Sequence, residues 1–232
     1  MKATVITRDK KAEKRIEQKL LNASFTLCKS TPEIIFVYGG DGSLVRSERL
    51  YPGILKVALK GSHTSKTHFY DESLLDTILT KITQKDYTIK KHTKLTAKYK
   101  NTTMEALNEI QIHNKNPGIA IRFNLYTNNT LTNKNIVGDG ALVATPFGST
   151  AYYYSTGGEP FDKGLGISFN NPHQRIRNRV IPDDSTIRIE ILRGDALLIR
   201  DNDPKMHHMK PKDKITIKKS NNIARFLRFP GL

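Results

Sequence analysis

The stretch that decides the fold is Ile34–Ser43, IIFVYGGDGS. Its first five residues form an uninterrupted apolar run, a pattern typical of a strand buried on both faces of a sheet. The run leads directly into Gly39 and Gly40, which predicts a tight turn. Ser43 is a residue type that caps helices, so a helix is expected over Leu44–Leu50. Strand, turn and helix together predict an α/β sheet in this part of the chain.

The turn itself is a candidate phosphate-binding site. Free N–H groups at a helix start attract phosphate, and Gly39, Gly40, Gly42 and Ser43 are the residues expected to contact it. The carboxylate of Asp41 would repel phosphate held there alone, so it needs a hydroxyl proton or a magnesium ion bound with the phosphates. Gly-Gly-Asp-Gly is also an ordinary turn sequence, and it matches neither the Walker loop nor the Gly-x-Gly-x-x-Gly pattern. A phosphate site and a simple turn therefore both remain open.

The first part of the chain alternates strands and helices around this stretch. The pattern predicts strands at Ala3–Thr7, Ser24–Cys28 and Ile54–Ala58, and helices at Lys10–Leu21 and Asp71–Ile82. This β-α-β-β-α-β order is expected of an open sheet with mainly parallel strands.

From about Tyr87 the apolar period changes to that of strands. Alternating or β-rich segments occur at Leu95–Tyr99, Ile119–Tyr126, Ile187–Leu192 and Ile215–Lys218, separated by turns rich in Asn, Gly and Pro. We therefore predict an α/β domain over residues 1–88 and an all-β domain over 89–223. The apolar tail, 224–232, is expected to dock back on the first domain.

Composition narrows the class of partner. The 232 residues include 38 Lys and Arg against 22 Asp and Glu, a net charge of +16 that favours polyanions such as nucleotides, polyphosphate or nucleic acid. No RNA- or DNA-binding motif, membrane-spanning run or signal peptide is present, and the histidines lack the spacing of a closed metal site. Cys28 is the one cysteine and is expected to be a buried thiol. We expect a cytoplasmic protein without a specific nucleic-acid or membrane partner.

A second informative stretch is Gly138–Gly158, GDGALVATPFGSTAYYYSTGG. An apolar strand leads into Thr145–Tyr152, where hydroxyl side chains precede a helix predicted over Thr150–Thr156. The ring of Tyr152 suits a flat nucleoside base. A capped helix with packed tyrosines explains the pattern equally well.

Together, Gly39–Gly42, Asn108–Glu109 and Asp139–Gly158 resemble the NAD kinase family in order and spacing. The resemblance implies transfer of a phosphoryl group from ATP or polyphosphate to the adenosine 2′-hydroxyl of NAD, with magnesium or another divalent metal bound to the donor. It also implies a homo-oligomer, a dimer or tetramer. Two rival functions are a lipid or diacylglycerol kinase with the same Gly-Gly-Asp-Gly and a catalytically silent NAD-binding protein.

The resemblance also assigns roles to residues. Asp41 matches the aspartate that takes the proton of the ribose hydroxyl. Glu109 makes chemical sense as a charged acceptor for ribose hydroxyls. The positions implied around the bound dinucleotide are Asn108, Glu109, Asp139, Thr145, Ser149, Thr150, Ala151 and Tyr152, with Phe69 as the equivalent of a family aromatic. The chain departs from the family pattern at Phe147 and in Gly61–Tyr70.

Overall fold

The computed structural model describes residues 1–61 and 70–232, and the chain folds into two compact units, 1–92 with 223–232, and 93–222. The elements of the first unit are β1 (Lys2–Ile6), α1 (Lys10–Asn22), β2 (Thr26–Leu27), β3 (Ile34–Gly39), α2 (Asp41–Leu50), β4 (Leu55–Lys60), the 3₁₀ turn η1 (Glu72–Leu74) and α3 (Leu75–Thr83). No helix in the described ranges is long and apolar enough to cross a membrane.

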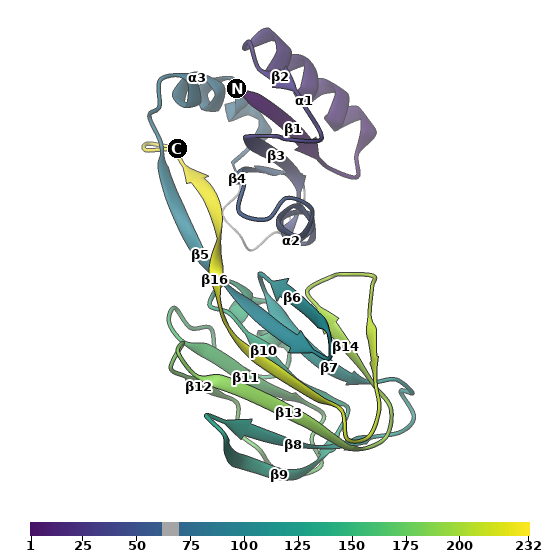
Figure 1. Cartoon of the computed structure of the whole chain (residues 1–232). Helices are drawn as coiled ribbons and strands as arrows, with labels where there is room; N and C mark the ends of the chain where they lie inside the picture. Colours follow the sequence, from purple (N-terminus) through teal and green to yellow (C-terminus); the bar gives the residue numbers. More distant parts are fainter. Residues whose placement is uncertain (62–69) are drawn as a thin grey trace. The chain divides into compact units, whose positions relative to one another are not determined.

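The central strand of the first unit is β3, as its apolar run predicts. It pairs in parallel with β1 and β4, and β2 pairs with β1 at the edge (Figure 1). Alternate residues point to opposite faces of a sheet. Ile34 and Phe36 therefore join the core beneath α1 and α3, while Ile35 and Val37 lie on the other face, where α2 contacts β3. The predicted open parallel sheet is confirmed.

Helix α2 begins earlier than the sequence predicts, because Gly40 and not Ser43 is its N-cap. Gly40 is extended, with φ −114° and ψ −170°, and its carbonyl accepts from the N–H of Ser43 at 2.9 Å. Gly39 turns the chain with φ +153°, and a Cβ there would lie 2.5 Å from Oγ of Ser43. The prediction of Ser43 as a cap was wrong, and Asp41 consequently lies in the first helical turn.

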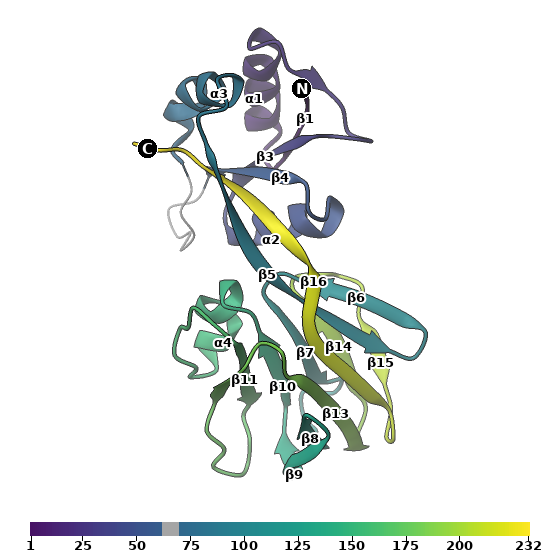
Figure 2. The same cartoon turned by 60° about the vertical axis from the view of Figure 1, so that its left-hand side comes forward.

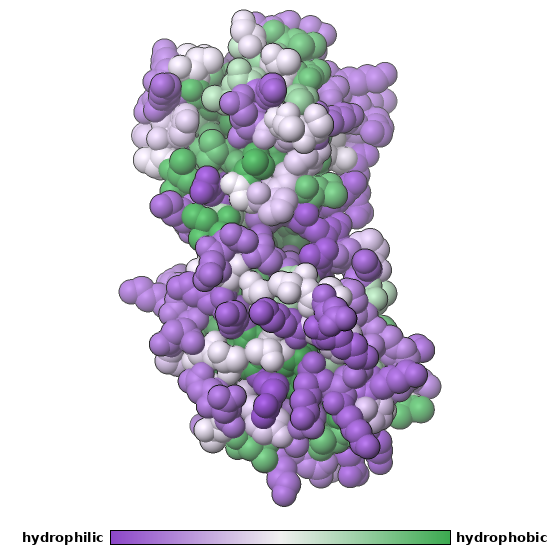
Figure 3. All heavy atoms as spheres, in the orientation of Figure 1, coloured by the Kyte–Doolittle hydropathy of each residue, from purple (hydrophilic) through white to green (hydrophobic). Residues whose placement is uncertain are grey.

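The second unit consists almost entirely of strands. Its elements, counting the strands that enter it from the first unit, are β5 (Thr88–Tyr99), β6 (Thr102–Ala106), β7 (Glu109–Asn114), β8 (Ile121–Thr127), β9 (Thr130–Gly138), β10 (Gly140–Ala144), η2 (Phe147–Thr150), α4 (Tyr152–Ser155), β11 (Leu165–Asn170), β12 (Arg179–Ile181), β13 (Thr186–Arg193), β14 (Ala196–Arg200), β15 (His207–Met209) and β16 (Lys214–Arg228). One sheet has the order β12-β11-β10-β7-β14-β15, and antiparallel strands β16-β13-β8-β9 form another layer (Figure 2). Buried Ile, Leu and Phe residues from both layers form one core. Hydrophilic residues cover most of the face of this unit seen in Figure 3.

Strand β16 takes part in both units. Its first half pairs with β13, where Thr186 lies opposite Lys218, and its end pairs with β4, where Arg225 lies opposite Leu55. Beyond it, the ring of Phe229 lies 5.3 Å from that of Tyr70, centroid to centroid. The tail residues Ile223–Leu232 therefore belong to the first unit.

Two local predictions were wrong. The helix expected over Thr150–Thr156 is reduced to α4, because Ala151 has the non-helical angles φ −97° and ψ −124° and separates α4 from η2. Cys28 is half-exposed, because it follows the two-residue edge strand β2. Its Sγ lies 3.5 Å from the hydroxyls of Ser30 and Thr31, whose hydrogen bonds lower the pKa of the thiol to about 6.

Candidate functional site

The Gly-Gly-Asp-Gly turn joins β3 to α2 in the first unit. Asp41 is half-buried in the first turn of α2, where the helix dipole favours a negative charge. The carbonyl of Gly39 accepts from the N–H of Gly61 at 3.0 Å, which ties the turn to the end of β4. Gly42 is exposed and Ser43 half-buried. The turn therefore presents a carboxylate and helix-start amides together, a combination suited to a phosphate that brings its own cation.

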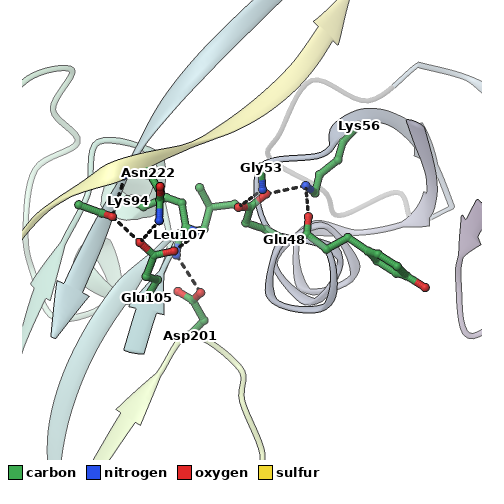
Figure 4. A network of polar contacts seen from close by, with 10 residues as sticks. Glu48, Gly53, Lys56, Lys94, Glu105, Leu107, Asp201 and Asn222 are labelled. Atoms are coloured by element: carbon green, nitrogen blue, oxygen red, sulfur yellow. Dashed lines mark hydrogen bonds and ion pairs between the residues drawn. The ribbon is translucent and has the colours of Figure 1, made fainter. Parts of the chain in front are cut away.

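A buried ion pair holds the other end of α2 (Figure 4). The ammonium of Lys56 donates to Glu48 at 2.5 Å and to the carbonyls of Tyr51 and Ile54 at 3.0 and 2.9 Å. The second oxygen of Glu48 accepts from the N–H of Gly53 at 3.0 Å. Because a lysine has three N–H donors, all three are used, and both charges lie in the interior without an unsatisfied group. The pair fixes the loop that returns from α2 to β4.

In the second unit, Asp201 fixes the loop that carries the Asn-Glu pair. It follows strand β14, and its carboxylate accepts from the N–H of Leu107 at 2.8 Å (Figure 4). It also accepts from the next two amides, those of Asn108 and Glu109, at 2.7 and 3.1 Å. The N–H of Asp201 in turn donates to the carbonyl of Glu109 at 2.9 Å. Nothing in the sequence pattern singles out Asp201, which lies 93 residues from Asn108.

The same loop is fixed to the hydroxyl-rich block. The hydroxyl of Thr145, fully buried, donates to the carbonyl of Leu107 at 2.6 Å and accepts from the N–H of Gly148 at 3.1 Å. A Cβ on Gly148 would lie 2.3 Å from the carbonyl oxygen of Asn108, so only glycine allows the two backbones to approach this closely. The structure thus brings Asn108 and Glu109 next to the start of the block.

Glu109 has an unusual environment. It is 6% exposed, and its Oε2 has no hydrogen-bond partner among the described residues. Burial, and then the nearby charge of Asp201, raises the pKa of Glu109 to about 8. Burial also raises the pKa of Asp201, to about 6, although its three amide hydrogen bonds oppose this shift. The sequence prediction treated Glu109 as an ordinary charged carboxylate, because burial depends on the tertiary fold.

The remaining predicted NAD-binding residues differ in their burial and in their hydrogen-bond partners. The pKa of the Tyr152 phenol is raised by burial and then by the charges of Glu109 and Asp139, so both carboxyl groups lie near its hydroxyl. Asp139 accepts from the side-chain amides of Asn114 and Asn171 at 3.1 and 2.7 Å. Ser149 is buried and donates to the carbonyl of Pro146 at 2.8 Å.

Of the other two positions in the block, Thr150 is exposed and Ala151 half-buried. Phe69 lies outside the described residues. The Gly-Gly-Asp-Gly residues and Ser43 belong to the first unit, while the predicted NAD-binding residues that the structure describes belong to the second.

The contacts of Thr145 give a first prediction. Thr145→Val keeps the side-chain shape but removes both hydrogen bonds, which leaves the Leu107 carbonyl and the Gly148 amide unsatisfied in the interior. We expect the free energy of unfolding, measured with urea, to fall by about 1–3 kcal/mol. Thr103→Val on the exposed part of β6 is the control and should change stability by less than about 0.5 kcal/mol. Equal stability of the two variants would contradict this role of Thr145.

The comparisons with known proteins agree with this geometry. Residues 107–229 match the family described as the ATP-NAD kinase C-terminal domain. An NAD kinase of Sulfurisphaera tokodaii is 30% identical over 223 residues, which cover 91% of this chain and 87% of that protein. A bifunctional NADP phosphatase/NAD kinase of Methanocaldococcus jannaschii is 30% identical over 207 residues, but the chain spans only 36% of its length.

Two solved structures share the fold. One is an NAD kinase from Archaeoglobus fulgidus in complex with ATP, with a TM-score of 0.84, 22% identity and coverage of 99% of this chain and 94% of that one. The other is yeast NADH kinase complexed with NADH, with a TM-score of 0.79, 18% identity and coverage of 88% and 65%. The matched family domain and the identity to whole NAD kinases lead to one conclusion: the chain belongs to the NAD kinase family.

Proposed function

We propose that this protein transfers the terminal phosphoryl group of ATP to the 2′-hydroxyl of the adenosine ribose of NAD and so forms NADP, with polyphosphate as an alternative donor. One observation carries the proposal: Asp201, Thr145 and Gly148 fix the Asn-Glu loop against the hydroxyl-rich block, so residues far apart in sequence meet in one place. The similarity to proteins named NAD kinase, and the ATP bound to the Archaeoglobus fulgidus protein, support the choice of substrates.

Each group of residues has a distinct task in this proposal. Asn108, Glu109 and Asp139 hold the polar groups of NAD, and Tyr152 lies against a planar ring, with Thr150 and Ala151 beside it. The backbone of Gly39, Gly40 and Gly42 binds donor phosphates. Asp41 orients the ribose hydroxyl and accepts its proton as the oxygen attacks phosphorus, since phosphoryl transfer depends mainly on positioning and charge stabilisation.

A divalent metal fits the first unit as a companion of the donor. The described residues contain no group of three or more His, Cys, Asp or Glu side chains arranged to hold a metal. Magnesium is commonly bound by one or two carboxylates together with substrate phosphates, and Asp41 at the start of α2 supplies such a carboxylate. When bound, the ion neutralises charge that develops on the transferred group.

The test is NADP formation by the purified chain from NAD, ATP and magnesium, followed by coupling to an NADP-specific dehydrogenase. We expect turnover that disappears when EDTA removes the metal. Parallel reactions replace ATP by polyphosphate and NAD by diacylglycerol in vesicles. NAD binding without turnover would identify a silent NAD-binding protein, and phosphorylation of diacylglycerol alone would identify a lipid kinase; either result overturns the proposal.

A further inference from the structure

Glu109 and Asp201 form a pair of carboxyl groups whose hydrogen bonds are unequal. Asp201 uses both oxygens as acceptors, one for the amide of Leu107 and the other for those of Asn108 and Glu109. A carboxyl group that accepts three N–H donors is favoured in its ionised form. Glu109 has the opposite situation, because it is buried and its Oε2 has no partner among the described residues.

The charged groups around Glu109 and Asp201 do not change which of the two carboxyl groups ionises more easily. Lys94 lowers the pKa of Asp201, and its ammonium donates to Glu105 at 2.8 Å. Arg200, beside Asp201 in sequence, is paired with Asp203 at 2.6 Å. Tyr152 of α4 lies near Glu109 from another element, and burial raises the pKa of its phenol, which keeps it neutral. Two neighbouring carboxyl groups in such a site cannot both ionise easily, so the proton resides on Glu109.

We propose that Glu109 contacts NAD as a neutral carboxylic acid, and that the ionised Asp201 beside it is a positioning residue that maintains this state. The inference rests on the proposed NAD-binding role of Glu109 and changes its chemistry. A neutral acid donates one hydrogen bond through its O–H and accepts another through its carbonyl oxygen, whereas a carboxylate only accepts. Glu109 therefore accepts a hydrogen bond from one ribose group and donates a hydrogen bond to another. It places no negative charge beside a ligand that carries a diphosphate.

Two free-protein states follow from the raised pKa of Glu109. Below about pH 8 the acid is neutral and ready to bind NAD. Above that pH it ionises, and NAD must bind the remaining neutral fraction, so the apparent Kd should rise about tenfold between pH 7 and pH 9. Binding should then take up a proton, approaching roughly three-quarters of a proton at pH 8.5. If Glu109 instead bound NAD as a carboxylate, binding near neutral pH would release the proton of Glu109, and the measured proton exchange would have the opposite sign.

The experiment is calorimetric titration of the full chain with NAD, at pH 7.0 and 8.5, in two buffers of different ionisation enthalpy at each pH. We expect proton uptake at pH 8.5 and almost none at pH 7.0. In Glu109→Gln, whose amide keeps one donor and one acceptor but cannot ionise, the uptake should vanish and the Kd should stay constant with pH. The control Glu190→Gln, on the opposite layer in β13, should behave like the unaltered chain.

Three outcomes would overturn the inference: proton release at pH 7.0, the absence of exchange at both pH values, and uptake that persists in Glu109→Gln. A chain that binds NAD with any of these results retains its proposed function, so the two failures are distinguishable. Asp201→Asn provides a second test. Its side-chain amide does not accept three N–H donors as the carboxylate does, and the substitution also removes the negative charge next to Glu109. We expect the pH at which the Kd begins to rise to move down in this variant.

A ligand-free measurement keeps the inference testable if a variant binds poorly. Because the pKa of Glu109 is raised on folding, the native chain binds the extra proton, and stability from this group is present at low pH and lost as pH rises towards about 8. Glu109→Gln lacks that loss. Its Tm should therefore exceed that of the unaltered chain at pH 8 and approach it at pH 5, and a pH-independent difference would contradict the neutral state.

Discussion

Replacing Asp41 by Asn is expected to lower kcat for NADP formation by about 10²–10⁴, with a much smaller change in NAD affinity. Asn keeps the size of the side chain and is tolerated in turns, but it neither accepts the hydroxyl proton nor carries the charge that a magnesium ion requires. Because Asp41 lies in the first turn of α2, the fold should lose the favourable dipole interaction, about 0.3–1 kcal/mol.

Measuring NAD binding by calorimetry beside turnover separates a catalytic role of Asp41 from a ligand-holding one. Asp9→Asn is the matched control, since Asp9 is the N-cap of α1, and Asn caps helices as well as Asp does. That control should keep its turnover. Unchanged kcat in Asp41→Asn would exclude the residue as the base, and an equal loss of binding and turnover would make it a ligand-holding residue.

The second large effect concerns the stability of the first unit. Lys56→Met removes the ammonium that pairs with the buried Glu48 carboxylate, and the free energy of unfolding should fall by about 3–5 kcal/mol. The side chains of Lys56 and Glu48 are 0% and 2% exposed, so water does not replace the lost partner. The measurement is urea unfolding followed by circular dichroism, with catalytic activity recorded in the native range.

Two further variants test the cause. Adding Glu48→Gln to Lys56→Met also removes the buried negative charge and should restore part of the lost stability. Lys10→Met breaks an exposed pair, in which Lys10 is 83% exposed, and should cost less than about 1 kcal/mol. A similar small loss in Lys56→Met would mean that the buried pair contributes little to holding α2.

Much of the fold follows from local sequence. The apolar run Ile34–Tyr38 predicts the central strand, because a strand covered on both faces has no polar position. The change of period near Tyr87 predicts the second, β-rich unit in the same way. Motif order and spacing also identify the family, since the hydroxyl-rich block and the Asn-Glu pair are specified residue by residue.

Local sequence patterns predict the starts of helices less well than they predict strands in this chain. Ser43 is a good helix cap by residue type, yet Gly40 takes that position because Gly39 turns the chain and packs against Ser43. Ala151 likewise interrupts the helix expected after Thr150. In both cases the backbone conformation of one residue, Gly39 or Ala151, decides where the helix begins, because helix propensity is a weak preference of less than about 1 kcal/mol per residue.

The electrostatic state of the site depends on tertiary structure alone. The sequence by itself determined the two-unit fold class and the family, and it predicts which residues contact a dinucleotide. Only the tertiary structure joined Asp201 to the amides of Leu107–Glu109, 92–94 residues away, and removed Glu109 from water. Burial and a neighbouring charge decide whether a carboxyl group is ionised, and both arise from residues distant in sequence, so no local pattern records them.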